Sequence, residues 1–142
     1  MARKTGTKSA RPPERDYSHR SLLDKLGVKP EHRIALLGIR DGRFLKELAT
    51  RATDVSVDHP RADCDLIFYA AENKKDLPHL ETMAAAIKKN GAIWVVYPKG
   101  QTQIREIDVI DAGKGAGLVD NKVVAFSGTH TALRLVIPLA RR

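Results

Sequence analysis

The sequence has a single cysteine, Cys64, among its 142 residues. One cysteine cannot form an intrachain disulfide or supply a thiolate cluster for zinc or iron. The five histidines are scattered over different predicted elements and show no metal-ligand spacing, so we expect no metal site. A chain without disulfides is typical of a reducing compartment, and we therefore expect a cytoplasmic protein.

Long apolar runs are also missing. No stretch approaches the ~20 apolar residues that a membrane-spanning helix needs, so we expect no membrane partner. Residues 1–20 lack the apolar core of a secretory signal. Aromatic residues make up only 5% of the chain, which leaves few side chains that can stack on nucleic-acid bases.

Positive charge is what the chain has in excess, with a formal net charge of +8. Residues 1–20 hold six Lys or Arg against two acids, a local excess of four positive charges with almost no apolar side chains. We expect residues 1–17 to be a disordered basic tail and residues 18–142 to form one domain. The tail is either a solvated segment or an arm that binds nucleic acid through residues 1–20.

The apolar pattern predicts alternating strands and helices. The run from Gly91 to Gly100 is almost continuously apolar, β-branched and aromatic, as in a strand buried on both faces of a parallel sheet. Further strands are predicted at 33–38, 54–58 and 65–71, and helices at 18–26, 41–52, 76–90 and 101–117. Two final strands, 122–127 and 132–138, are close enough for a hairpin. The predicted helix caps are Ser18, Asp41, Asp76 and Asp108.

This order predicts an α/β fold with a doubly wound, mostly parallel sheet of six strands and a C-terminal antiparallel hairpin. Only residues 58–65 separate the second predicted strand from the third. A crossover between parallel strands needs a dozen residues or more, so no additional strand and helix can lie between them.

The same order resembles the class I S-adenosylmethionine-dependent methyltransferases over roughly residues 19–140. The resemblance lies in a strand ending at Gly38, an acid (Asp58) about 20 residues further on, the 65–71 strand, the run Lys89–Val95 and the closing hairpin. It implies the strand order 2-1-4-5-7-6 in the labels of that fold, with strand 3 missing. Shorter pieces also resemble a small bacterial domain family of unknown function, which implies the fold but no activity: Leu23–Gly27, Trp94–Lys99 and Gly117–Ala125.

The chain departs from the methyltransferase pattern where those enzymes hold their cofactor. In them an acid at the end of the first strand is followed by Gly-x-Gly-x-Gly, which lets the backbone approach the cofactor. Here Leu36 or Leu37 replaces the acid and Arg40 replaces the middle glycine. A cation at that place opposes a sulfonium cofactor in a low-dielectric cleft. We therefore expect no bound cofactor, with S-adenosylmethionine as the alternative.

Open α/β sheets bind ligands at the carboxyl ends of their strands. Arg40 at a helix start and Lys99 after the central strand favour an anion at this rim, unless both are solvated loop charges. Asp58 suits either ribose hydroxyls or a turn before Pro60. The candidate ligand-binding residues are Gly38, Arg40, Asp41, Asp58, Tyr97 and Lys99.

Two other motifs are weaker. Glu72-Asn73 follows its strand where methyltransferases often place catalytic groups, but the Asn-Pro-Pro-aromatic signature is missing, so we expect no catalytic residue. The glycine-rich Gly113–Gly117 closes a predicted helix, whereas a phosphate-binding loop opens one, so we reject that interpretation.

Three functions remain open. The first is a non-catalytic, methyltransferase-like module that binds an anionic small molecule or a protein partner at the rim. The first alternative is a divergent S-adenosylmethionine-dependent methyltransferase. The second alternative is a nucleic-acid-associated protein that uses its basic tail.

Overall fold

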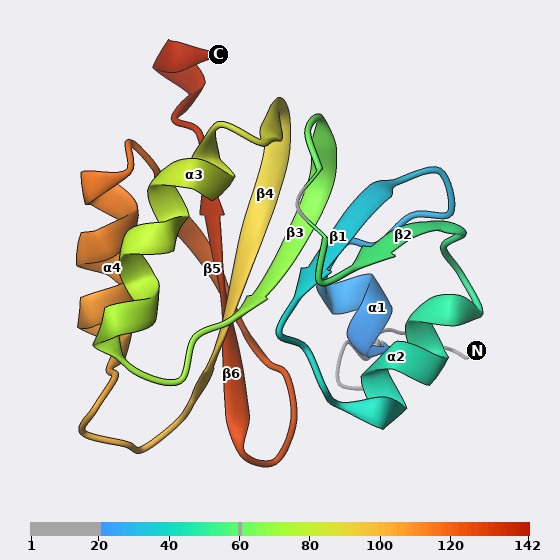
Figure 1. Ribbon diagram of the computed structural model, residues 1–142, viewed down its shortest axis with the longest axis horizontal. Coiled ribbons are helices and arrows are strands. Elements are labelled where there is room, and N and C mark those ends of the chain that lie inside the picture. Colours follow the sequence, from blue (N-terminus) through green and yellow to red (C-terminus); the bar gives the residue numbers. More distant parts are fainter. Residues whose placement is uncertain (1–20, 60) are drawn as a thin grey trace, which may run out of the picture.

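The computed structural model describes residues 21–59 and 61–142, so the predicted tail and the predicted cap Ser18 lie outside the described residues. The strands are β1 (Arg33–Leu37), β2 (Asp54–Val57), β3 (Cys64–Ala70), β4 (Ile87–Pro98), β5 (Val119–Ala125) and β6 (His130–Val136). They form one six-stranded sheet in the order β2-β1-β3-β4-β6-β5 (Figure 1). Strands β2, β1, β3 and β4 are parallel, and β6 is antiparallel to both β4 and β5. The predicted fold class and strand order are confirmed.

Helices cover both faces of the sheet (Figure 1). They are α1 (Leu22–Lys25), α2 (Gly42–Ala49), the 3-10 helix η2 (Lys74–His79), α3 (Leu80–Ala84), α4 (Glu106–Gly115) and the short 3-10 turn η3 (Leu139–Arg141). One face of the sheet packs against α1 and α2, through Leu23, Leu26, Phe44 and Leu48. The other face packs against η2, α3 and α4, through Leu77, Leu80, Met83 and Val109. The sheet is therefore the middle layer of three.

Strand β4 lies inside the sheet and contributes buried side chains to both of its faces, as its apolar run predicts. Ala92, Trp94 and Val96 point to the α1/α2 side, and the residues between them point to the other side. Trp94 is fully buried, and its indole Nε1–H donates a hydrogen bond to the Leu26 carbonyl at 3.1 Å. This bond satisfies the only polar atom of the ring and ties the end of α1 to the sheet.

The helix predicted at 76–90 is wrong in both of its limits. Asn73, not Asp76, is the N-cap, and the Asp76 carboxylate accepts hydrogen bonds from the N–H groups of Glu72 and Asn73. Helical structure ends at Ala84, and β4 already begins at Ile87, so Asn90-Gly91 lies inside the strand. Gly91 is required there by close packing, since a Cβ would lie 2.8 Å from the Cys64 carbonyl oxygen.

Smaller differences concern caps and strand limits. The Ser21 hydroxyl caps α1, while Asp41 caps α2 as predicted, with its Oδ1 accepting from the Phe44 N–H at 3.0 Å. Asp108 lies in the first turn of α4 instead of capping it, and accepts from the Arg105 N–H at 2.9 Å. The two strands of the final hairpin each begin earlier than predicted.

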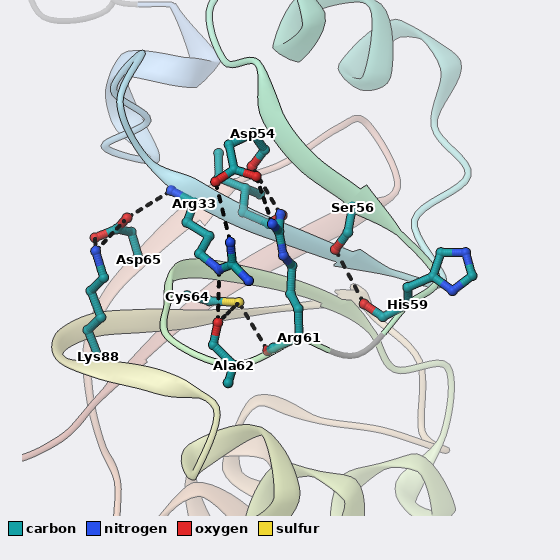
Figure 2. A network of polar contacts seen from close by, with 10 residues as sticks. Arg33, Asp54, Ser56, His59, Arg61, Ala62, Cys64, Asp65 and Lys88 are labelled. Atoms are coloured by element: carbon teal, nitrogen blue, oxygen red, sulfur yellow. Dashed lines mark hydrogen bonds and ion pairs between the residues drawn. The ribbon is translucent and has the colours of Figure 1, made fainter.

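The connection from β2 to β3 is short, and Arg33 and Arg61 tie it to strands β1 and β2 (Figure 2). The Arg61 guanidinium pairs with the Asp54 carboxylate at 2.7 Å and donates to the carbonyl oxygens of Ile34 and Asp54. Arg33 also contacts Asp54, at 3.6 Å, and donates to the Ala62 carbonyl at 2.9 Å. Arg61 therefore ties the connection to β1 and β2. It also lines a small apolar cavity of about 190 Å³.

Removing this arginine should loosen that edge of the sheet. We expect Arg61→Ala to lower the free energy of unfolding by about 1–2 kcal/mol, a modest value because the Asp54 side chain is half exposed. Urea denaturation followed by circular dichroism measures it. Arg43→Ala, at an exposed arginine of α2, is the matched control, and an equal loss in both variants would contradict the role of Arg61.

Candidate functional site at the carboxyl rim of the sheet

A cavity of about 520 Å³ opens at the carboxyl ends of the parallel strands. Its walls come from the loop after β1, the ends of β3 and β4, and the turn between β5 and β6. The lining residues are Gly38, Ile39, Arg40, Asp41, Ala70, Glu72, Val96, Phe126, Ser127, Thr129 and His130. The cavity lies at the rim where the sequence predicts a ligand.

Asp58, directly after β2, is held at this rim by two donors. Its Oδ1 accepts a hydrogen bond from the Gly38 N–H at 2.8 Å, and its Oδ2 pairs with Arg40 Nη2 at 2.9 Å. These bonds from Gly38 and Arg40 lower the pKa of the Asp58 carboxyl below its ordinary value. The Arg40 side chain is 70% exposed, so its ion pair with Asp58 is weak and can open at little cost.

The lowered pKa of Asp58 has a measurable consequence. This carboxylate stabilises the fold above its unfolded pKa of about 3.9, and the contribution disappears as the pH falls through the lower folded pKa. In Arg40→Gln the Gly38 N–H still donates, so we expect the pKa of Asp58 to rise but to stay below its ordinary value. An NMR titration of the carboxyl carbons measures both proteins. An ordinary pKa in the unmodified chain would contradict the geometry.

Gly38 lets the backbone turn tightly beneath the cavity. Its φ is +77°, a region that favours glycine, and a Cβ there would lie 3.4 Å from the Ala70 Cβ. The small residues Gly38, directly after β1, and Ala70, at the end of β3, thus keep the floor of the cavity open. The helix α2 begins just beyond, where Asp41 both caps the helix and lines the cavity.

The structure brings four of the six predicted site residues together and separates the other two. Gly38, Arg40, Asp41 and Asp58 meet at the rim. Tyr97 is buried on the opposite face of the sheet, and this burial together with the charge of Glu106 raises the pKa of its hydroxyl. Lys99 is exposed and is not among the lining residues. The predicted pairing of two cations is therefore not formed.

The sequence points to Glu72 but not to the polar cluster that it forms with the final hairpin on the other side of the cavity. His130 Nε2 lies 3.3 Å from Glu72 Oε2, and His130 Nδ1 lies 2.8 Å from the Thr129 hydroxyl. The Ser127 hydroxyl accepts from the N–H groups of Thr129 and His130, which fixes the turn. A carboxylate bonded to an imidazole can accept a proton and pass it on.

The balance of charge in the cavity is opposite to that of the chain. Asp41 and Glu72 contribute carboxylates to the lining, and among the described residues that line it Arg40 is the only Lys or Arg. That guanidinium is already paired with a third carboxylate, Asp58. The site is thus locally acidic in a protein of net charge +8, and it favours a ligand that carries positive charge.

The chain shares its fold with S-adenosylmethionine-dependent methyltransferases. It is similar to such an enzyme from Aquifex aeolicus, with a TM-score of 0.63 and 16% identity over 82% of this chain and 87% of that chain. A TehB-like methyltransferase from Corynebacterium glutamicum gives 0.59 and 13%, over 82% and 85%. Magnesium protoporphyrin IX methyltransferase from Synechocystis, solved with S-adenosylhomocysteine bound, gives 0.56 and 8%, over 82% and 78%.

These likenesses concern the fold, because the sequence identities are low. No family model and no curated protein matches the sequence, so the resemblance to a bacterial family of unknown function stays a prediction. Within residues 21–59 and 61–142, no three His, Cys, Asp or Glu side chains are grouped to hold a metal ion. No helix in that part of the chain is long and apolar enough to cross a membrane.

Proposed function

We propose that this chain is a small S-adenosylmethionine-dependent methyltransferase that binds its cofactor in the rim cavity. The observation that carries the proposal is the Asp58 carboxylate, fixed by the Gly38 N–H beside a cavity lined with further acids. The shared fold supports the proposal, since one of the structurally similar enzymes, with a TM-score of 0.56, was solved with S-adenosylhomocysteine bound. This revises the expectation that an anion binds here, because that expectation needed two cations at the rim.

The described residues fit the cofactor at two points. Asp58 Oδ2 can accept a ribose hydroxyl once Arg40 moves away, while Oδ1 stays bonded to Gly38. The acids of the lining favour the positive charge of a sulfonium. The departures in sequence remain, with Leu36 or Leu37 in place of the acid and Arg40 in place of the middle glycine. In addition, with only residues 58–63 between β2 and β3, the segment that helps to wall the adenine in larger enzymes has no room.

When bound, S-adenosylmethionine supplies an electrophilic methyl group on its sulfonium sulfur. A hydroxyl or amine acceptor must lose a proton in the course of methyl transfer. Glu72 and His130 form the acid–base pair that lines the cavity, and we assign the removal of that proton to them. The Thr129 hydroxyl, bonded to His130 Nδ1, holds the imidazole in place.

Isothermal titration calorimetry with the full chain tests the proposal. We expect S-adenosylmethionine to bind one to one with a Kd of about 1–100 µM, and adenosine to bind more weakly because it lacks the methionine portion. No heat of binding at millimolar S-adenosylmethionine would refute the proposal.

The acidic lining predicts a difference between two related ligands. S-adenosylmethionine carries the sulfonium charge, whereas S-adenosylhomocysteine has a neutral sulfur. We expect Glu72→Gln to weaken binding of the former by about 5- to 10-fold, which corresponds to a partly screened charge interaction, and to leave the latter nearly unchanged. Calorimetry with both ligands measures the difference. Equal weakening of both would show that Glu72 acts on the shape of the cavity and not through its charge.

One observation favours a second candidate, a non-catalytic module that binds an anionic ligand. Arg40, whose side chain is largely exposed, lies two residues before the start of α2, where the first-turn N–H groups that Asp41 does not cap also attract anions. Titration with inorganic phosphate separates the two functions. Phosphate binding that Arg40→Gln abolishes, in a chain that does not bind S-adenosylmethionine, would select this candidate.

A further inference from the structure

A second cavity, of about 730 Å³, adjoins the rim cavity between α1, α2 and the turn that joins β5 to β6 (Figure 1). The two cavities share Asp41, Phe126 and Ser127 in their walls, so one molecule can extend from the second cavity into the first. We call the second cavity the α2 groove, because Arg43, Lys46 and other residues of that helix form one of its walls. Its volume is within the range of small-molecule sites.

Part of the α2 groove is apolar and rigid. Phe44 of α2 and Phe126, which follows β5, both line it, and their ring centroids are 4.8 Å apart. Both rings are buried in the core on this face of the sheet. Leu22 of α1 also lines the groove and packs against the same core. These fixed side chains offer an apolar surface to a ring or a short hydrocarbon chain.

The wall that α2 provides carries more positive than negative charge. Arg43, Lys46 and Glu47 are three or four residues apart, so they share one side of the helix. Arg43 and Lys46 are exposed, and no ion pair joins either of them to a carboxylate in the part of the chain that the structure describes. Asp41, in the shared wall, already accepts the Phe44 N–H. The groove beyond the shared wall thus has two cations and one acid, whereas the rim cavity is acidic.

We propose that the α2 groove binds the acceptor of the methyl transfer, and that this acceptor is a hydroxylated or aminated carboxylic acid with an apolar body. The inference rests on the proposed function. The body lies on Phe44 and Phe126, and the carboxylate lies beside Arg43 and Lys46. The hydroxyl or amine extends past Ser127 towards the acid–base pair of the rim cavity. The charges fix this orientation, because the acidic rim cavity repels a carboxylate and the groove attracts it.

Fluorescence titration of two naphthalene probes with the full chain tests the inference. The probe 6-hydroxy-2-naphthoate has an apolar body with a hydroxyl at one end and a carboxylate at the other, and 2-naphthol lacks the carboxylate. We expect the naphthoate to bind with a Kd of about 0.01–1 mM and 2-naphthol to bind more weakly. No binding of the naphthoate at millimolar concentration would overturn the inference.

Removing the two cations should affect only the probe that carries the acid. We expect the double variant Arg43→Gln, Lys46→Gln to weaken the naphthoate by about 5- to 20-fold and 2-naphthol by less than about twofold. Both positions are exposed, so the fold should be retained. The matched control is Lys89→Gln, Lys114→Gln, which removes two exposed charges outside the groove. An equal loss for both probes, or an equal loss in the control, would contradict the carboxylate site.

S-adenosylhomocysteine separates this inference from the proposed function. We expect the naphthoate and S-adenosylhomocysteine to bind together, with the naphthoate shifting the amide signals of Lys46, Thr50 and Gly128, which line the groove. Displacement of the naphthoate by S-adenosylhomocysteine would place the probe in the cofactor cavity and overturn the inference. A chain that binds S-adenosylhomocysteine but neither probe would refute the acceptor site alone. A chain that binds the naphthoate through the two cations but no cofactor would refute the methyltransferase function and leave the groove as an acid-binding site.

Discussion

Replacing Trp94 with alanine should lower the free energy of unfolding by about 3–5 kcal/mol, the range for removing a large buried aromatic side chain. The ring is 0% exposed at the centre of β4, and its Nε1–H is the donor that holds the Leu26 carbonyl at the end of α1. The substitution leaves a cavity between the sheet and α1 and also leaves that carbonyl without its partner. Urea denaturation followed by far-ultraviolet circular dichroism measures the change.

The variant Trp94→Phe separates the two contributions to this loss. Phenylalanine keeps most of the apolar volume but cannot donate to Leu26, so we expect a smaller loss of about 1–3 kcal/mol. A loss below about 1 kcal/mol in Trp94→Ala would mean that β4 is not the centre of the core.

Changing Asp58 to asparagine should weaken the binding of S-adenosylhomocysteine by about 10- to 100-fold, the range for a lost hydrogen bond to a charged group. The neutral amide keeps the size of the side chain and tolerates the φ of +58° at this position, so the loop should keep its shape. Arg40→Ala should bind as well as the unmodified chain or better, because it frees Asp58 Oδ2. Calorimetry on the three proteins gives the comparison.

Asp63→Asn is the matched control for this experiment. Asp63 is exposed and has a φ of +57°. It lies outside the rim cavity, whereas Asp58 bonds directly to Gly38 and Arg40, which line it. The two substitutions are thus alike in chemistry and backbone conformation. Equal affinity in all of these variants would exclude Asp58 from the binding of the nucleoside.

Much of the fold follows from local patterns. The β-branched run at Gly91–Gly100 identifies the central strand, and the short count of residues after Asp58 excludes a further strand and helix. The limits of the helix before β4 do not follow, because Asn90-Gly91 usually ends a helix. Here Gly91 is needed instead for the close approach to the Cys64 carbonyl, which is a long-range contact.

The residues of the site can also be sorted into those that local sequence patterns predict and those that depend on long-range contacts. Gly38 and Asp58 follow from the order of the strands, since each ends a strand at the same rim. Tyr97 does not, because a strand buried on both faces has no alternation to show whether Val96 or Tyr97 faces the cavity. The contact between Glu72 and His130 depends on the register of β4 with β6, where Pro98 pairs with His130. A hairpin signal alone cannot fix that register.

The most direct test of the cofactor site is to map where the ligand binds in solution. A titration of ¹⁵N-labelled full chain with S-adenosylhomocysteine, followed by amide chemical shifts, shows which backbone groups sense the ligand. We expect the largest changes at Gly38, Asp58 and Thr129, with α4 unaffected. Changes confined to any other surface, or none at saturating ligand, would contradict a nucleoside site at the carboxyl rim.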